Sequence, residues 1–146
     1  MKKSITRYVC DHFVTLLMGF IPLEHEYKLM GMAPYASLSR SQEVARSFER
    51  LYVWREGYYQ VRSRTRPRLS IFQSWLHEVK NILRFKRFDD ICGGLQLFTE
   101  QALKQWVKYW VTKTGISDVA FSGGVFMNVK ANLEIMKMRE VERIFV

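Results

Sequence analysis

The sequence has little cysteine, few histidines and no uninterrupted apolar run of membrane-spanning length. Its two cysteines, Cys10 and Cys92, lie far apart and lack CxxC spacing, which argues against a disulfide framework or a cysteine zinc site. The three histidines show neither HxxxH nor HxxH spacing, so no helix face presents two of them to a metal. Asp11 and His12 interrupt the first apolar run, residues 9–20, which argues against a signal peptide or membrane helix. These features favour a reducing cytoplasm.

Apolar and aromatic residues, by contrast, are plentiful. The 146 residues are 48% hydrophobic and include ten Phe, seven Tyr and four Trp, which is enough for a globular domain with a real core. The formal net charge is +9, and residues 40–87 hold 12 Lys and Arg against 4 Glu. Nearly all the positive excess therefore belongs to this middle segment.

The first half predicts two helices separated by a loop. A helix is expected over residues 6–18, ended by Gly19 in a left-handed conformation, and another after Ser41 as N-cap. Two prolines and two glycines predict an ordered loop over residues 20–39. Its expected apolar anchors are Leu23, Tyr27, Leu29, Met30 and Met32.

The pattern of the middle segment predicts short elements and a loop on the protein surface. We expect a turn and short strand over residues 56–61, a charged surface loop over 62–68, and a short helix over 75–83.

The last third has the most regular pattern. A substantially buried helix is expected from Asp89 or Asp90 to about Lys113, followed by Gly115. Then come a strand over residues 118–122, a Gly-Gly turn, a helix over 125–138 and a strand over 143–146. This order predicts a parallel βαβ unit. The buried face of the long helix should carry Ile91, Leu95, Phe98, Ala102, Trp106 and Tyr109.

The turn Ser122-Gly123-Gly124 is the first candidate site. Glycines between a strand and a helix let a ligand approach the backbone N–H groups, although a tight turn needs glycine for its dihedral angles alone. Asn128 and Asn132 follow on one helix face, where asparagine is a poor helix former. They either serve a ligand or form local hydrogen bonds.

Lys28 and Gly31 belong to a second candidate segment, the loop around Pro34. The Lys28 ammonium could meet a phosphate or carboxylate, although a solvated lysine is the commoner outcome. No nucleophile stands beside an evident base, so the residues alone do not indicate a hydrolase.

Two segments resemble motifs of the O-carbamoyltransferases that modify nodulation factors, cephems and aminoglycosides. They are HEYKLMGMAPYA, which includes residues 26–36, and SGGVFMNVKAN, residues 122–132. The resemblance implies an α/β fold, part of an actin-like ATPase (ribonuclease H-like) domain related to the tRNA threonylcarbamoyl-transfer proteins. In such enzymes, carbamoyl phosphate and ATP form carbamoyl adenylate in a separate domain. The actin-like domain then passes the carbamoyl group to a substrate hydroxyl.

The resemblance also implies roles for individual residues. Lys28 and Gly31 would lie near the adenylate pocket. The residues lining it would be Ser122, Gly123, Gly124, Val125, Asn128 and Asn132.

Three parts of the family pattern are missing from this sequence: a metal-binding HxxxH pair, a Gly-Asp-Gly segment with a further ligand of the divalent metal, expected to be iron, and the adenylate-forming domain. Ala36 stands where the family usually has glycine. We therefore expect residues 1–146 to be an internal fragment of the N-terminal actin-like domain, with a variable basic insertion over 40–87. Without metal ligands it should not turn over alone.

Two other functions are compatible with the residues. Five arginines interleaved with Tyr58 and Tyr59 could bind single-stranded nucleic acid, although a solvated insertion explains them better. A remnant that pairs with another chain, or with a second copy of itself as a homo-oligomer, would use the strand at residues 144–146. The arginines are Arg55, Arg62, Arg64, Arg66 and Arg68.

Overall fold

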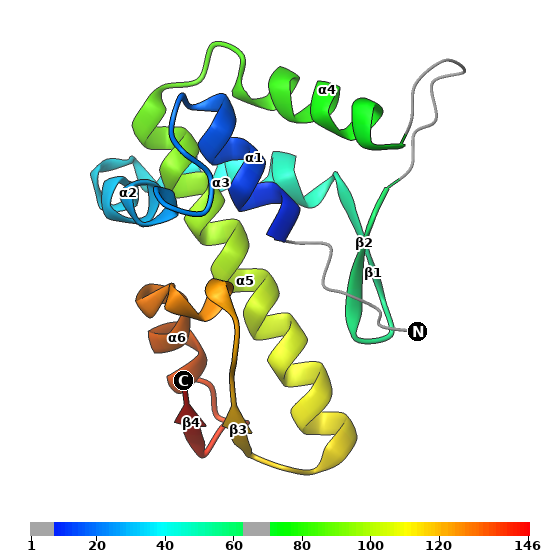
Figure 1. Ribbon diagram of the computed structural model, residues 1–146. Helices are drawn as coiled ribbons and strands as arrows, with labels where there is room; N and C mark the ends of the chain where they lie inside the picture. The colour runs from blue at the N-terminus through cyan, green and yellow to red at the C-terminus, as the bar shows by residue number, and fades with distance from the viewer. Residues whose placement is uncertain (1–7, 63–70) are drawn as a thin grey trace. The chain divides into compact units, whose positions relative to one another are not determined.

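The computed structural model describes residues 8–62 and 71–146, with the side chains of residues 8–10 and 71–72 left aside. It is a mixed α/β structure of helices and two small sheets (Figure 1). The chain divides into two compact units, the first reaching to Phe98 and the second beginning at Thr99.

The first unit is mainly helical. Its elements are α1 (Tyr8–Leu17), α2 (Glu26–Met32), η1 (Ala33–Tyr35), α3 (Leu38–Glu49), β1 (Tyr52–Arg55), β2 (Tyr58–Val61), α4 (Ile71–Leu83) and the start of α5 (Phe88–Thr114). The expected first helix is confirmed, and Gly19 follows it with a φ of +82°. The helix expected over residues 75–83 is confirmed as the longer α4.

The prediction of a loop over residues 20–39 was wrong, because α2 and η1 occupy much of this segment. Local hydrogen bonds organise the approach to α2: the Leu23 N–H donates to Glu26 Oε1 over 2.7 Å, and the Ile21 N–H to His25 Nδ1 over 3.1 Å. Proline suits the first turn of a helix, so Pro34 lies inside η1, directly after its first residue Ala33, instead of ending all helical structure.

The apolar anchors expected in that loop were mostly wrong as well. Leu29 is buried, and Met30 is partly buried. Leu23, Tyr27 and Met32 are exposed. Leu23 precedes α2, and α2 places Tyr27 and Met32 on faces that the rest of the described first unit does not cover.

Helix α3 begins earlier than expected. Ser37, not Ser41, is the N-cap residue, and Ser41 is a buried residue inside the helix. The reason lies in α5: a Cβ on Gly93 would stand 2.2 Å from Ser41 Oγ, and one on Gly94 would stand 2.4 Å from Val44 Cβ. The two glycines thus let α3 pack almost against the α5 backbone, which buries Ser41.

Strands β1 and β2 form an antiparallel hairpin in which Tyr52 pairs with Val61 and Arg55 with Tyr58. The turn residues Glu56 and Gly57 both have positive φ, 37° and 91°, as tight hairpins require. The predicted turn and second strand are confirmed, whereas β1 was not predicted. Of the expected surface loop over 62–68, residues 63–68 lie outside the described residues.

The long helix is confirmed as α5, and Gly115 follows it with a φ of +71°. In the second unit the rest of α5 is joined by β3 (Asp118–Ala120), η2 (Gly124–Met127), α6 (Val129–Met136) and β4 (Arg143–Phe145). Strands β3 and β4 pair in parallel, Asp118 opposite Arg143 and Ala120 opposite Phe145, which confirms the predicted βαβ unit (Figure 1). The core of this unit consists of Leu103, Val107, Val111, Phe126, Ala131, Ile135 and Val141.

The prediction of one helix over residues 125–138 was wrong in one respect. The segment is divided into η2 and α6 at Asn128, whose ψ of 88° is not helical. This division places Asn128 at the start of a new helix and determines the role of its side chain.

Candidate functional site

The turn between β3 and η2 presents its backbone openly. The Phe121 N–H donates to the Phe145 carbonyl over 2.8 Å, which extends the parallel pairing to the edge of the turn. Ser122, Gly123 and Gly124 that follow are exposed. Gly123 has a φ of 115° and a ψ of 160°, a region essentially restricted to glycine. No described atom lies within 4 Å of a Cβ built on it, so a ligand could approach this backbone closely.

Two phenylalanines hold the ends of this turn. Phe121 immediately precedes it and Phe126 closes it, and their rings stack with centroids 4.2 Å apart and planes 4° apart. Phe126 belongs to the core of the second unit, and the Trp106 ring lies 6.5 Å from each phenylalanine. The exposed backbone therefore rests on an ordered aromatic base.

Both predicted asparagines form local hydrogen bonds. Asn128 Oδ1 accepts from the Ala131 N–H over 3.0 Å and caps α6. Asn132 Nδ2 donates to the Phe126 carbonyl over 2.7 Å. Asn132 Oδ1 is buried and finds no hydrogen-bond partner within the described part of the chain. The local-bonding alternative thus accounts for these hydrogen bonds of both residues, and the acceptor oxygen of Asn132 remains without a described partner.

Lys28 and Gly31 lie on α2, in the first unit, whereas the Gly-Gly turn lies in the second. The partly buried Lys28 places its Nζ 5.6 Å from the centre of the Phe20 ring and 5.9 Å from that of Tyr27. Such cation–π contacts hold the ammonium without neutralising it. Gly31 is exposed, and no described atom would meet its Cβ.

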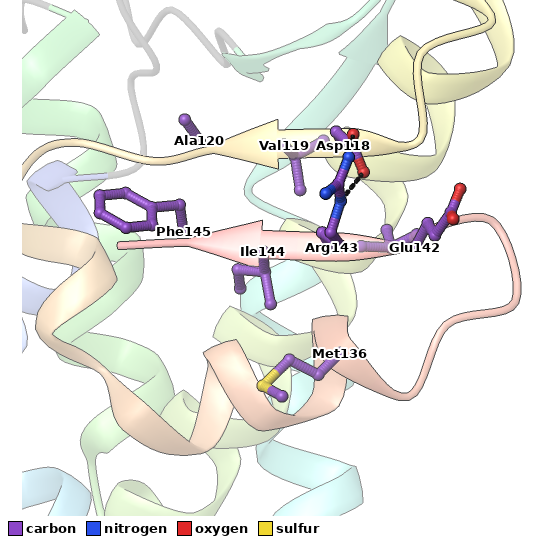
Figure 2. A pocket seen from close by; sticks show the side chains of 9 residues that line it. Asp118, Val119, Ala120, Met136, Glu142, Arg143, Ile144 and Phe145 are labelled. Atoms are coloured by element: carbon purple, nitrogen blue, oxygen red, sulfur yellow. Dashed lines mark hydrogen bonds and ion pairs between the residues drawn. The ribbon is translucent and has the colours of Figure 1, made fainter.

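A pocket of about 590 Å³ opens at the strands β3 and β4. In Figure 2 the Arg143 guanidinium lies against the Asp118 carboxylate, with Met136 of α6 and Phe145 around the same hollow. Arg143 Nε donates to Asp118 Oδ1 over 2.9 Å. This hydrogen bond and the guanidinium charge hold the pKa of the Asp118 carboxyl below its usual range. The sequence analysis did not identify this pair, although an acidic residue at the start of one strand and a basic residue at the start of the next were a usable signal.

The expected divalent metal does not fit the residues that the structure describes. Among them no group of three His, Cys, Asp or Glu side chains could hold an ion. His12 Nδ1 lies 3.9 Å from Glu26 Oε1, which is a single weak contact. Burial raises the pKa of the Cys92 thiol to about 12, so this sulfur is neither a thiolate ligand nor a nucleophile at neutral pH.

Some of the residues on which the hypothesis of nucleic-acid binding depends lie outside the described part of the chain. Arg64, Arg66 and Arg68 belong to the undescribed segment 63–70. Tyr59 is buried, and its ring packs 4.8 Å from that of Trp54. It could stack on a base only by leaving the hairpin.

A family model described as the carbamoyltransferase N-terminus matches residues 8–146. A search of curated proteins gave no match. Within residues 8–62 and 71–146, every helix is too short or too polar to cross a membrane.

Proposed function

Because the chain belongs to the family that carries the carbamoyltransferase N-terminus, we propose that it forms the nucleotide-facing part of an ATP-dependent O-carbamoyltransferase. In this proposal the second unit is part of an actin-like ATPase domain, and its βαβ unit supports that assignment. The ligand is carbamoyl adenylate, made from ATP, carbamoyl phosphate and water with release of phosphate and pyrophosphate. A hydroxyl oxygen of the acceptor attacks its carbamoyl carbon, the bond from that carbon to the phosphate oxygen breaks, AMP leaves and the hydroxyl proton passes to solvent.

The observation that carries the proposal is the exposed Gly123-Gly124 turn. It stands where β3 passes into η2, and Gly123 has dihedral angles essentially restricted to glycine, with open space where its Cβ would be. Backbone N–H groups at the start of a helical turn have no partners within that turn and favour an anion. The adenylate phosphate is such an anion.

The other predicted residues have supporting roles in this proposal. Ser122 offers an exposed hydroxyl, and the N–H of Val125 lies within the same turn. The Asn128 amide stands at the end of the turn. The roles of Lys28 and Gly31, which lie in the first unit, remain what the family resemblance implies.

No step is derived through a metal, because the described residues do not fit one. We propose that the 146-residue chain by itself does not transfer a carbamoyl group. Incubation with ATP, carbamoyl phosphate and an aminoglycoside should leave the acceptor at its original mass. Mass spectrometry that detects a carbamoylated acceptor would refute this part of the proposal and leave nucleotide binding untouched.

The test of nucleotide binding is a titration of the ¹⁵N-labelled chain with ATP, followed by NMR. We expect the resonances of Gly123, Gly124 and Val125 to shift in a saturable way. Gly123→Ala should weaken binding at least tenfold, because alanine cannot hold a φ of 115° and the turn must change. The matched control is Gly115→Ala, another glycine with positive φ and open space in the same unit. If both variants bind ATP as the unmodified chain does, the turn is not the nucleotide site.

A further inference from the structure

The turn Ser122–Val125 contains two adjacent glycines, which retain more backbone freedom in solution than any other residue pair. A ligand that binds such a turn must first order it. The conformational entropy lost in this step lowers the affinity unless the turn is already ordered in the free protein. The side chains that order the turn therefore matter as much as those that touch the ligand.

One restraint is the ring pair already described. Phe121 and Phe126 flank the turn directly, and their parallel rings close a loop of four residues between them. Phe126 is 5% exposed, so the base of this loop is fixed in the core of the second unit. The pair brings the two ends of the turn together but leaves the orientation of η2 open.

Asn132 supplies the second restraint. Its Nδ2 reaches back six residues, across the non-helical Asn128, and donates to the Phe126 carbonyl over 2.7 Å. This bond connects the first turns of α6 to η2, although the backbone between them is not continuous helix. It sets the orientation of η2, and with it the direction of the N–H groups of Gly124 and Val125.

We infer that Asn132 is a positioning residue that holds the Gly-Gly turn in its ligand-binding conformation, with the Phe121–Phe126 stack as its base. The inference rests on the proposed function. It replaces the role that the family resemblance implied for Asn132, that of a residue lining the pocket. Asn132 acts on the nucleotide through Phe126 and the turn.

Asn132→Leu tests the inference, because leucine keeps nearly the same volume and removes the donor. The matched control is Ile135→Val, which trims a fully buried side chain of α6 without touching the turn. Both variants should lower the unfolding temperature of the chain. Two further readouts separate them: the ¹⁵N order parameters of Gly123 and Gly124, and the Kd for ATP.

In Asn132→Leu the order parameters of both glycines should fall toward the flexible range. The Kd for ATP should rise roughly fivefold, as expected for the loss of one net hydrogen bond. Ile135→Val should leave both readouts unchanged. If Asn132→Leu matches Ile135→Val in order parameters and Kd, Asn132 has only a structural role. If the unmodified chain does not bind ATP, the proposed function fails, and the order parameters still decide whether Asn132 positions the turn.

Discussion

Arg40 donates its Nε–H to Asp90 Oδ2 over 2.7 Å, which joins α3 to the third residue of α5. The Asp90 side chain is 4% exposed, whereas that of Arg40 is 52% exposed. Asp90 Oδ1 finds no hydrogen-bond partner among residues 8–62 and 71–146. The half-exposed arginine is therefore the main compensation for a carboxylate that the packing of the first unit removes from water.

Removal of Arg40 should destabilise the first unit more than removal of an ordinary surface arginine. Arg40→Met leaves the buried Asp90 carboxylate without its cation, and we expect a loss of about 3 kcal/mol in the free energy of unfolding. Urea denaturation measures this loss. The control is Arg46→Met on the same helix, which should stay within about 0.5 kcal/mol. Equal effects of the two variants would show that the ion pair contributes nothing.

Gly94→Ala should be strongly unfavourable. The new Cβ would stand 2.4 Å from Val44 Cβ and 3.0 Å from the Ser41 carbonyl oxygen, so α3 must move away. We expect a loss of about 2 kcal/mol or more, despite the better helix propensity of alanine. Gly31→Ala, also in a helix but with open space, should stabilise the chain by about 0.5–1 kcal/mol. Thermal melts measure both effects. If the unfolding temperatures of the two variants shift in the same direction, the close packing of α3 against the α5 backbone is contradicted.

The Asp118–Arg143 pair should make stability depend on acid pH. The folded pKa of Asp118 lies below the unfolded value of 3.8, so the contribution is fully present above that value. It is lost as the pH falls through the folded pKa. Asp118→Asn should therefore unfold at a lower temperature than the unmodified chain at neutral pH, and this difference should shrink as the pH falls below 3.8 and through the folded pKa. Arg143→Gln added to Asp118→Asn should change little further, and a difference that persists in strong acid would exclude the pairing as its cause.

Asn128→Ala should weaken α6 through the loss of its cap. The Ala131 N–H would lose its acceptor at a helix start, which typically costs about 1 kcal/mol. Asn128→Asp keeps an acceptor oxygen at the same place and serves as the control. Urea unfolding followed by circular dichroism measures both, and equal losses would show that the cap does not stabilise the helix.

Local pattern predicted most elements of the second unit. The helical spacing of Ala102, Trp106 and Tyr109 predicted its part of α5, and the Gly-Gly turn between two short apolar segments predicted the parallel βαβ unit. Such elements are specified by their own periodicity and turn residues, so no knowledge of distant contacts is needed. The motif around Gly123 also led to the family that the family comparison shows.

The first unit was harder because its decisive contacts are distant in sequence. Pro34 and Gly31 favoured a loop, yet α2 and η1 form there. Ser41 has the composition of an N-cap, yet it is buried where Gly93 lets two helices approach. Propensity cannot show either outcome, because each depends on a surface supplied by another element.

By itself, the amino-acid sequence determined the regular elements of the last third, the glycine turn and the family. Only the tertiary structure decided what the asparagines do, since both were equally compatible with ligand binding and local bonding. The division of the expected helix at Asn128 makes one of them a cap and sends the amide of Asn132 back to Phe126. The physical reason is that a side chain's role depends on which backbone groups lie within about 3 Å of it. That distance is determined by the packing of the whole unit.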